Sequence, residues 1–140
     1  MRHVTFPIVL AIVVALPTVA PGQTTIVPNS KIAAFTPPSI MRDGFKTVPL
    51  DDLELKALID LRVYDITDNW IGEVSGLIRG ASRRPIGAVV DVGGFLGMGE
   101  RSVAIRLDSL TVLQNIEGDR TRLYLAATDA ALDALPEYDS

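Results

Sequence analysis

The chain has 140 residues, of which 48% are hydrophobic and 21% charged, and its formal net charge is -4. This length fits one globular domain with extensions and leaves no room for a second full domain. The sequence has no cysteine, and His3 is its one histidine. Disulfides, Cys-His or Ser-His-Asp catalysis, and metal ligation by cysteine or histidine are therefore excluded for any mature chain that starts after His3.

The N-terminus has the layout of a secretory signal peptide. A basic start, Arg2-His3, precedes an uninterrupted apolar run over residues 8–16. This run is shorter than the about 20 apolar residues that span a bilayer, and small residues suited to a signal peptidase follow it. We predict cleavage after Gly22, so that residues 1–22 are the signal peptide, and an uncleaved anchor is the alternative.

Export would place the mature chain in the periplasm of a bacterium with two membranes, and otherwise outside the cell, with no stable membrane span after cleavage. The charge of the mature chain is unevenly distributed. Residues 51–140 hold 9 basic and 16 acidic residues, which gives this part a net charge of -7. An acidic surface repels nucleic acid, so nucleic acid is excluded as a partner.

Residues 23–50 are predicted to be a flexible Pro-rich tether. Prolines recur at positions 28, 37, 38 and 49, and neither a two-residue nor a 3.6-residue period is sustained. Apolar pieces such as 32–35 have little use in a purely solvated linker, so docking of one piece on the domain or on a partner is the alternative. Asp51-Asp52-Leu53-Glu54 has the spacing of a capping box and predicts a helical turn where the domain begins.

Residues 51–140 have the pattern of a small β domain. Val103, Ile105 and Leu107 alternate with polar residues and share one face of a predicted strand. Ile71, Val74 and Leu77 are instead three apart, which predicts a β-bulge at Gly72 or Gly76. The six predicted strands are 57–63, 70–78, 86–92, 102–107, 111–116 and 122–127, and Thr128 is expected to cap a short helix over 129–135.

The segment VVDVGGFLGMGERSVAI, residues 89–105, resembles the PRC-barrel family. The resemblance extends over about residues 55–138 and includes, in order, Leu58-Ile59, Val63-Tyr64, residues 71–74, Thr128, Leu132 and Pro136-Glu137-Tyr138. It implies a small β-barrel of about six strands that acts as an assembly or interaction module, without catalytic residues to carry over. Asp60 departs from the pattern, because the family commonly has glycine there.

Four glycines, Gly93, Gly94, Gly97 and Gly99, invite comparison with a phosphate-binding loop. No Lys-Ser/Thr pair follows them and the G-x-G-x-x-G spacing is broken at Ser102, so we interpret them as loop glycines at positive φ. Between them lie the apolar residues Phe95, Leu96 and Met98. These either seal the barrel or present an adaptable surface to a partner.

Other polar groups receive plainer interpretations. Glu73, Asp91 and Glu100 are candidate acid–base carboxylates, but nothing in the sequence brings two of them together. Asp65, Asp68 and Asn69 lack the spacing of a calcium loop and are interpreted as a hairpin turn. Trp70 is expected in the core or at its rim. Arg79, Arg83 and Arg84 are expected at one loop tip, where an anionic lipid or an acidic protein could meet them.

The sequence thus favours a non-enzymatic, exported PRC-barrel module that binds a protein partner in the cell envelope, with no metal and no cofactor. Phe95, Leu96, Met98 and the arginine tip are its candidate interaction residues. A carrier of small apolar ligands, or an enzyme that uses the barrel mouth, is the alternative function. A homo-oligomer is a further possibility.

Overall fold

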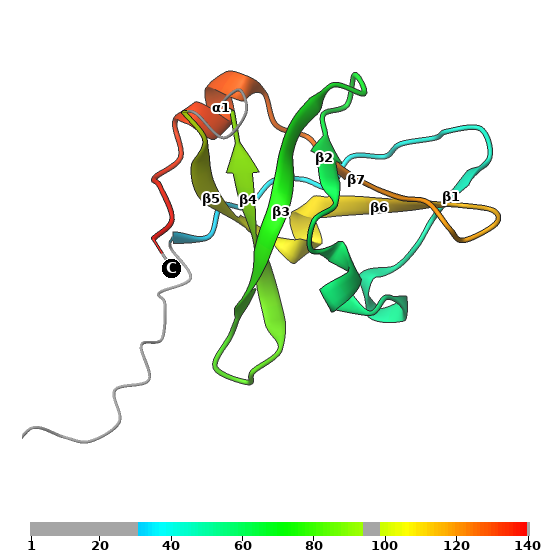
Figure 1. Cartoon of the computed structure of the whole chain (residues 1–140), viewed down its shortest axis with the longest axis horizontal. Coiled ribbons are helices and arrows are strands. Elements are labelled where there is room, and N and C mark those ends of the chain that lie inside the picture. Colours follow the sequence, from blue (N-terminus) through cyan, green and yellow to red (C-terminus); the bar gives the residue numbers. More distant parts are fainter. Residues whose placement is uncertain (1–30, 94–98, 140) are drawn as a thin grey trace, which may run out of the picture.

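The computed structural model describes residues 31–93 and 99–139 of the chain. Seven strands in this part form one sheet in the order β1-β6-β7-β2-β3-β4-β5, which curls into a small barrel with a short helix at one end (Figure 1). Neighbouring strands are antiparallel except β2 and β7, which run parallel. The predicted all-β class and the short C-terminal helix are confirmed.

The bounds of the elements agree well with the predicted ones. The strands are β1 Phe45–Thr47, β2 Arg62–Tyr64, β3 Trp70–Arg79, β4 Pro85–Val92, β5 Arg101–Arg106, β6 Leu110–Asn115 and β7 Thr121–Leu125. Short 3-10 helices, η2 Leu50–Asp52, η3 Leu55–Leu58 and η4 Leu107–Ser109, and one α-helix, α1 Asp129–Asp133, complete the described part. Five of the six predicted strands coincide with β3 to β7 to within two residues.

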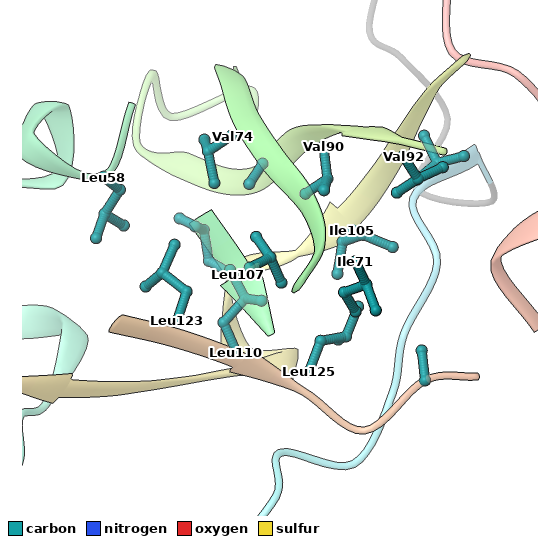
Figure 2. Packing of buried hydrophobic residues seen from close by; sticks show 14 of the residues in the cluster. Leu58, Ile71, Val74, Val90, Val92, Ile105, Leu107, Leu110, Leu123 and Leu125 are labelled. Carbon is teal, nitrogen blue, oxygen red and sulfur yellow. The ribbon is translucent and has the colours of Figure 1, made fainter. Parts of the chain in front are cut away.

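Aliphatic side chains from every part of the sheet fill the barrel interior. Figure 2 shows Val74 and Val90 of one hairpin turned toward Leu123 and Leu125 of β7. Val63, Val90 and Leu123 have no exposed surface. Burial of each such side chain contributes about 1.5–3 kcal/mol, and a chain without cysteine depends on this packing for its stability.

Two irregularities in β3 explain the three-residue spacing of its core positions. The register with β2 skips Ile71, and the register with β4 skips Ser75. Each extra residue reverses which face the following residues occupy. Ile71, Val74 and Leu77 consequently all belong to the same core cluster, which confirms the predicted bulge beside Gly76.

Gly72 is required by a close approach between strands. A Cβ at this position would lie 2.5 Å from the carbonyl oxygen of Asp91 and 2.9 Å from a methyl group of Val90. Gly76, four residues later, has no atom nearer than 3.9 Å to such a Cβ. The two glycines of β3 therefore have different functions, because only Gly72 lets β4 approach.

The first predicted strand, 57–63, is wrong in its first half. Its start belongs to η3, and only Arg62–Tyr64 is a strand. Asp60, between the two, has a φ of 68°, a left-handed conformation that ends an extended segment and that glycine adopts without strain. The predicted helical turn at the start of the domain is present as η2 and η3, but the capping box is wrong, because neither helix has a side-chain cap.

A flexible tether does not describe residues 31–50, which lie against the barrel. We call residues 32–48 the strap. Its first residue, Ile32, is only 5% exposed, Ala33 forms a parallel bridge with Ile105 of β5, and β1 pairs with β6. The alternative of docking on the domain is therefore correct for this segment, and residues 23–30 lie outside the described part.

Hydrogen bonds from buried hydroxyl groups hold the middle of the strap. The backbone N–H of Phe35 donates to Ser109 Oγ at 2.9 Å, and Thr111 Oγ1 donates to the carbonyl oxygen of Pro38 at 2.6 Å. Ser109 and Thr111 are two of the few polar residues inside the core. Proline suits this segment because it has no N–H that needs a partner and its fixed φ reduces the entropy lost on ordering.

The strap and the C-terminal tail meet on β5. Ala33 N–H donates to Ala104 O and Arg106 N–H donates to Ala33 O, while Tyr138 N–H donates to Ser102 O, each at 2.8 Å. Ile32 and Tyr138 pack there in a second, smaller cluster outside the barrel. Figure 1 shows the two ends of the coloured chain close together beside β5.

Helix α1 covers the end of the barrel at which β4 finishes and β5 begins (Figure 1). The hydroxyl of Thr128 accepts from Ala131 N–H at 3.2 Å, which confirms the predicted cap. Leu132 inserts into the core, and Arg101 of β5 donates to the carbonyl oxygens of Asp133 and Leu135. The end of the helix is thus tied to the start of β5.

We predict that Gly72→Ala destabilises the barrel by about 3 kcal/mol or more, because the new methyl group meets the Asp91 backbone and cannot be accommodated by a side-chain rotation. Gly76→Ala, the matched control, should change stability by less than about 1 kcal/mol. Urea unfolding of both variants measures the difference. Equal stability of the two variants would show that the approach at Gly72 is not a constraint.

We also predict that Ser109→Ala combined with Thr111→Val costs about 2–3 kcal/mol, because two strap groups lose their buried partners. Tryptic cleavage after Arg42 should become faster as the strap loosens. The exposed pair Ser75→Ala and Thr47→Val is the control and should change neither property. Unchanged cleavage after Arg42 in the first variant would contradict the role of the two hydroxyl groups.

Candidate functional site

The glycine-rich loop is described only at its two ends. Gly93 and Gly99 have φ values of 71° and 77°, as predicted for loop glycines. Gly94, Phe95, Leu96, Gly97 and Met98 lie outside the described residues. The proposal that Phe95, Leu96 and Met98 meet a partner is therefore not addressed by the structure.

The three tip arginines lie at the opposite end of the same hairpin. Arg79 ends β3, Arg83 and Arg84 follow in the turn, and all three are exposed. Gly93, in contrast, follows the last residue of β4. The eight residues of β4 separate the two places, which is about 25 Å of extended chain. The arginine tip and the described ends of the glycine-rich loop thus lie at opposite ends of the hairpin.

The turn between β2 and β3 is ordered by its own polar groups. Asp65 Oδ1 accepts from the backbone N–H groups of Thr67 at 2.8 Å and Asn69 at 2.9 Å. Asn69 Nδ2 also donates to Asp65 Oδ2 at 3.2 Å. These carboxylate oxygens serve the turn itself, which supports the hairpin interpretation over a calcium loop.

Asp68 joins this turn to the strap and to β7. Its carboxylate accepts from the hydroxyl of Tyr124 at 2.7 Å, from Arg42 of the strap at 2.8 Å and from Arg122 at 3.1 Å. The guanidinium of Arg122 also lies over the ring of Tyr64, 4.1 Å from its centroid. We call this set, Asp68 with Arg42, Arg122, Tyr124 and Tyr64, the Asp68 network. Sequence analysis missed it.

The same contacts shift the ionisation of the groups in the turn. Hydrogen bonds from Tyr124 and Arg42 lower the pKa of the Asp68 carboxyl below its ordinary 3.8, although burial opposes this. Burial raises the pKa of the Asp65 carboxyl, but hydrogen bonds from Asn69 and Thr67 outweigh this effect, so that its pKa is also lowered. Burial, with Asp68 as acceptor, raises the pKa of the Tyr124 hydroxyl. The network is therefore ionic at neutral pH, with Tyr124 as a donor.

Large apolar side chains are exposed on the two loops that the Asp68 network joins. Met41 is 98% exposed, Ile66 62% and Trp70 58%. Trp70 thus lies further out than the predicted core or rim. Its indole N–H donates to the carbonyl oxygen of Gly72 at 2.8 Å, and the guanidinium of Arg62 lies 4.6 Å from its ring centroid. We call Met41, Ile66 and Trp70, with Arg62, the Trp70 face.

The Trp70 face and the ends of the glycine-rich loop are at the same end of the barrel. Gly72 pairs with Val92 in the β3–β4 ladder, so the start of β3 lies beside the end of β4. Figure 1 shows the β2–β3 turn and the end of β4 on one side and the β3–β4 turn on the other. The sequence offered one sign of this exposed surface. Trp70 stands at the start of a predicted strand, just before Ile71 and Gly72, and a residue in that position can face outward.

The candidate carboxylates are arranged differently from the prediction. Glu73 and Asp91 are direct partners across β3 and β4, with Arg62 opposite Glu73 and Ser102 opposite Asp91. Ser102 Oγ donates to Asp91 Oδ1. The strand register thus brings two carboxylates together, which the sequence did not show. They lie on the outer face of the sheet, whereas Glu100 follows Gly99 and is exposed.

A cavity of about 260 Å³ lies outside the core between η2, η3 and the start of β4, lined in part by Leu50, Leu55 and Ile86. This is smaller than the about 300–1,000 Å³ typical of ligand sites, and the interior is filled by the core cluster. The interior of the described barrel is filled, and a ligand at the barrel mouth stays a prediction.

Within residues 31–93 and 99–139, no group of three or more His, Cys, Asp or Glu side chains is placed to hold a metal ion. No helix in that part is both long and apolar enough to cross a membrane.

Comparison with known proteins gives one result for the barrel. A family model, described as the PRC-barrel domain, matches residues 51–132. No curated protein matches the chain. The match begins where the strap has ended and includes β2 to β7 together with most of α1.

We predict that Asp68→Asn lowers the free energy of unfolding by about 1 kcal/mol at pH 7, since the half-exposed ion pairs are screened and the hydrogen bond to Tyr124 is weakened. Asparagine also accepts the positive φ of this position. Because the folded pKa lies below 3.8, the contribution of Asp68 is present above that pH and is lost as the pH falls through the folded value.

The variant should therefore lose less stability than the wild type between pH 5 and about pH 2, as measured by urea unfolding across this range. Asp43→Asn, which removes one exposed carboxylate from the strap, is the control and should keep the acid dependence of the wild type. Parallel acid dependence of wild type and Asp68→Asn would show that Asp68 is not linked to folding.

Proposed function

The chain belongs to the PRC-barrel family, and we propose that it is a non-enzymatic module that binds a protein partner in the cell envelope. A barrel of this kind does not by itself define a function. The proposal therefore rests on the surface of this chain, and one observation carries it: Trp70 is exposed yet held in a fixed orientation.

Fixing an exposed tryptophan reduces the entropy that binding would otherwise cost. The indole N–H of Trp70 is already satisfied by Gly72, and Arg62 covers one face of the ring. The remaining surface is apolar and open to a partner. Tryptophan and arginine are the residue types most enriched among those that dominate the energy of protein interfaces.

We include Ile66 and Met41 in this surface because the Asp68 network joins the two segments that carry them. Ile66 projects from a turn that four hydrogen bonds to Asp65 keep in shape, and Met41 lies next to Arg42, which is bound to Asp68. Methionine adapts readily to the shape of a partner. A fixed aromatic anchor and an adaptable apolar residue, both exposed, favour a protein partner over a small ligand.

We include Phe95, Leu96 and Met98 in the same proposal, because Gly93 and Gly99 flank them and lie at the same end of the barrel as Trp70. Glu73 and Asp91 do not favour hydrolytic chemistry, since they lie on the outer face of the sheet and Asp91 accepts a hydrogen bond from Ser102 Oγ. Export rests on the basic start and apolar run of the N-terminus. Mass spectrometry of the mature chain from cells should find Gln23 at or near its start.

We predict that Trp70→Ser combined with Ile66→Ser weakens partner binding at least about tenfold, because it removes the central anchor of the surface. The measurement is crosslinking and capture of the tagged full chain in intact cells, followed by titration of the captured partner. Ile86→Ser is the matched control, since Ile86 is partly exposed at the opposite end of the hairpin. It should bind like the wild type.

The melting temperature separates binding from folding. The double variant should melt close to the wild type, because both side chains are mostly exposed. Equal capture of the same protein by wild type and double variant would refute the Trp70 face. If sedimentation shows concentration-dependent oligomers that the double variant abolishes, the partner is a second copy of the chain.

A further inference from the structure

The turn between β3 and β4 carries the densest positive charge on an otherwise acidic molecule. Arg79, Arg83 and Arg84 occur within six residues, and the next acidic residue along the chain is Asp91. Residues 51–140 as a whole have a net charge of -7. We call these three arginines the basic tip.

The backbone of the basic tip is ordered. Gly80 N–H donates to Arg84 O and Arg83 N–H donates to Gly80 O, both at 2.9 Å. Arg79 adds a bond from its guanidinium to the carbonyl oxygen of Arg83 at 3.1 Å. Arg83 has a φ of 62°, an unusual conformation for arginine that these bonds maintain. The positions from which the three side chains project are therefore defined.

The charge of the basic tip is not neutralised within the described chain. The salt bridges found there use Arg42, Arg106 and Arg122, and none uses a tip arginine. On the 3-10 helices beside this end, Asp108 is paired with Arg106, and Asp51, Asp52 and Glu54 form no salt bridge with a tip arginine. Three guanidinium groups thus remain available to an external anion.

The shape and composition of the tip favour a flat array of phosphates over a protein. Figure 1 shows the β3–β4 turn projecting beyond the rest of the barrel. A flat surface can therefore contact the turn without meeting other parts of the barrel. Its central residues are Gly80, Ala81 and Ser82, which offer no aromatic or large aliphatic anchor of the kind that protein interfaces need. Arginine, with its planar fork of donors, binds phosphate oxygens in pairs.

The N-terminal part of the chain also leads to this hairpin. Ile32, close to the first described residue, packs against Ile78, the residue before Arg79. Eleven residues, 21–31, separate it from the apolar stretch 4–20, which is at most about 40 Å of extended chain. If the N-terminus stays uncleaved, which is the alternative to cleavage after Gly22, a bilayer that holds residues 4–20 lies within about 40 Å of Ile32.

We propose that the basic tip docks the barrel on an anionic phospholipid surface, with the guanidinium groups of Arg79, Arg83 and Arg84 on lipid phosphates. In this orientation the Trp70 face points away from the bilayer, because it lies at the other end of β3. Lipid docking does not depend on the proposed protein partner. Either activity can fail without the other.

Vesicle binding tests the proposal with the full chain. We compare partition into phosphatidylcholine vesicles containing about a third phosphatidylglycerol with partition into pure phosphatidylcholine. The apolar N-terminus binds both kinds of vesicle, so its contribution cancels in the ratio of the two partition coefficients. Near physiological salt, each arginine at an anionic surface strengthens binding about fivefold, so the ratio for the wild type should exceed about tenfold and fall in high salt.

The variant Arg79→Ser, Arg83→Asn, Arg84→Ser removes the tip charges, and asparagine at position 83 accepts the positive φ. Its ratio should fall to near one while its melting temperature stays close to that of the wild type. The control Lys46→Ser, Lys56→Ser, Arg120→Ser removes the same net charge from exposed positions elsewhere. It should keep most of the preference for anionic vesicles.

Three outcomes would overturn the proposal. The wild type shows no preference for anionic vesicles, the tip variant keeps the preference, or the control loses as much as the tip variant. If the wild type fails to bind vesicles and instead captures an acidic protein that the tip variant does not capture, that result would assign the tip to a protein partner. The tip variant should lose vesicle binding and keep partner capture, whereas Trp70→Ser should keep vesicle binding and lose partner capture. These two results distinguish the two surfaces.

Discussion

Unpaired backbone groups along β5 and β6 are the constraint on which this small barrel depends. The matched domain, residues 51–132, ends its sheet at these two strands, and exposed strand edges invite association with other chains. The strap covers both, through Ala33 on β5 and β1 on β6. Ser109 and Thr111 bind its backbone from the core between these points. A segment outside the family domain thus completes the fold.

The strap also connects the fold to the proposed binding surface. Arg42 leaves the strap to bind Asp68, which Tyr124 and Arg122 hold from β7. This single carboxylate therefore fixes the position of the β2–β3 turn relative to the sheet. Met41 and Ile66 belong to the strap and the β2–β3 turn, and the Asp68 network joins these two segments. The order of the Trp70 face is in this sense a product of barrel closure.

Features set by neighbouring residues were predictable from the sequence. The alternation in β5 and the three-residue spacing of Ile71, Val74 and Leu77 gave the strands and a bulge, and Thr128 gave the start of α1. A local pattern also misled, because apolar residues 57–59 lie in a 3-10 turn and not in a strand. Prolines concealed the strap, since a Pro-rich segment without periodicity looks the same whether it is solvated or docked.

Features set by the register and by distant pairs were not predictable. The Asp68 network joins residues 26 to 56 positions apart, and the pairing of Glu73 with Asp91 depends on where two bulges shift the strands. The outward placement of Trp70 follows from the same shifts. The arginine tip was found because a turn is local, whereas its distance from the glycine-rich loop required the length and direction of β4.

Ile32 and Tyr138, near the two ends of the barrel, meet on β5, and this has a consequence for how the barrel can be connected to other sequences. Ile32 and Tyr138 share one small cluster, so the point of entry and the point of exit are neighbours on a single strand. A domain with adjacent ends can be inserted into a loop of a host protein or circularly permuted with a short linker, because neither operation has to stretch across the fold. The barrel therefore has the geometry of a portable unit.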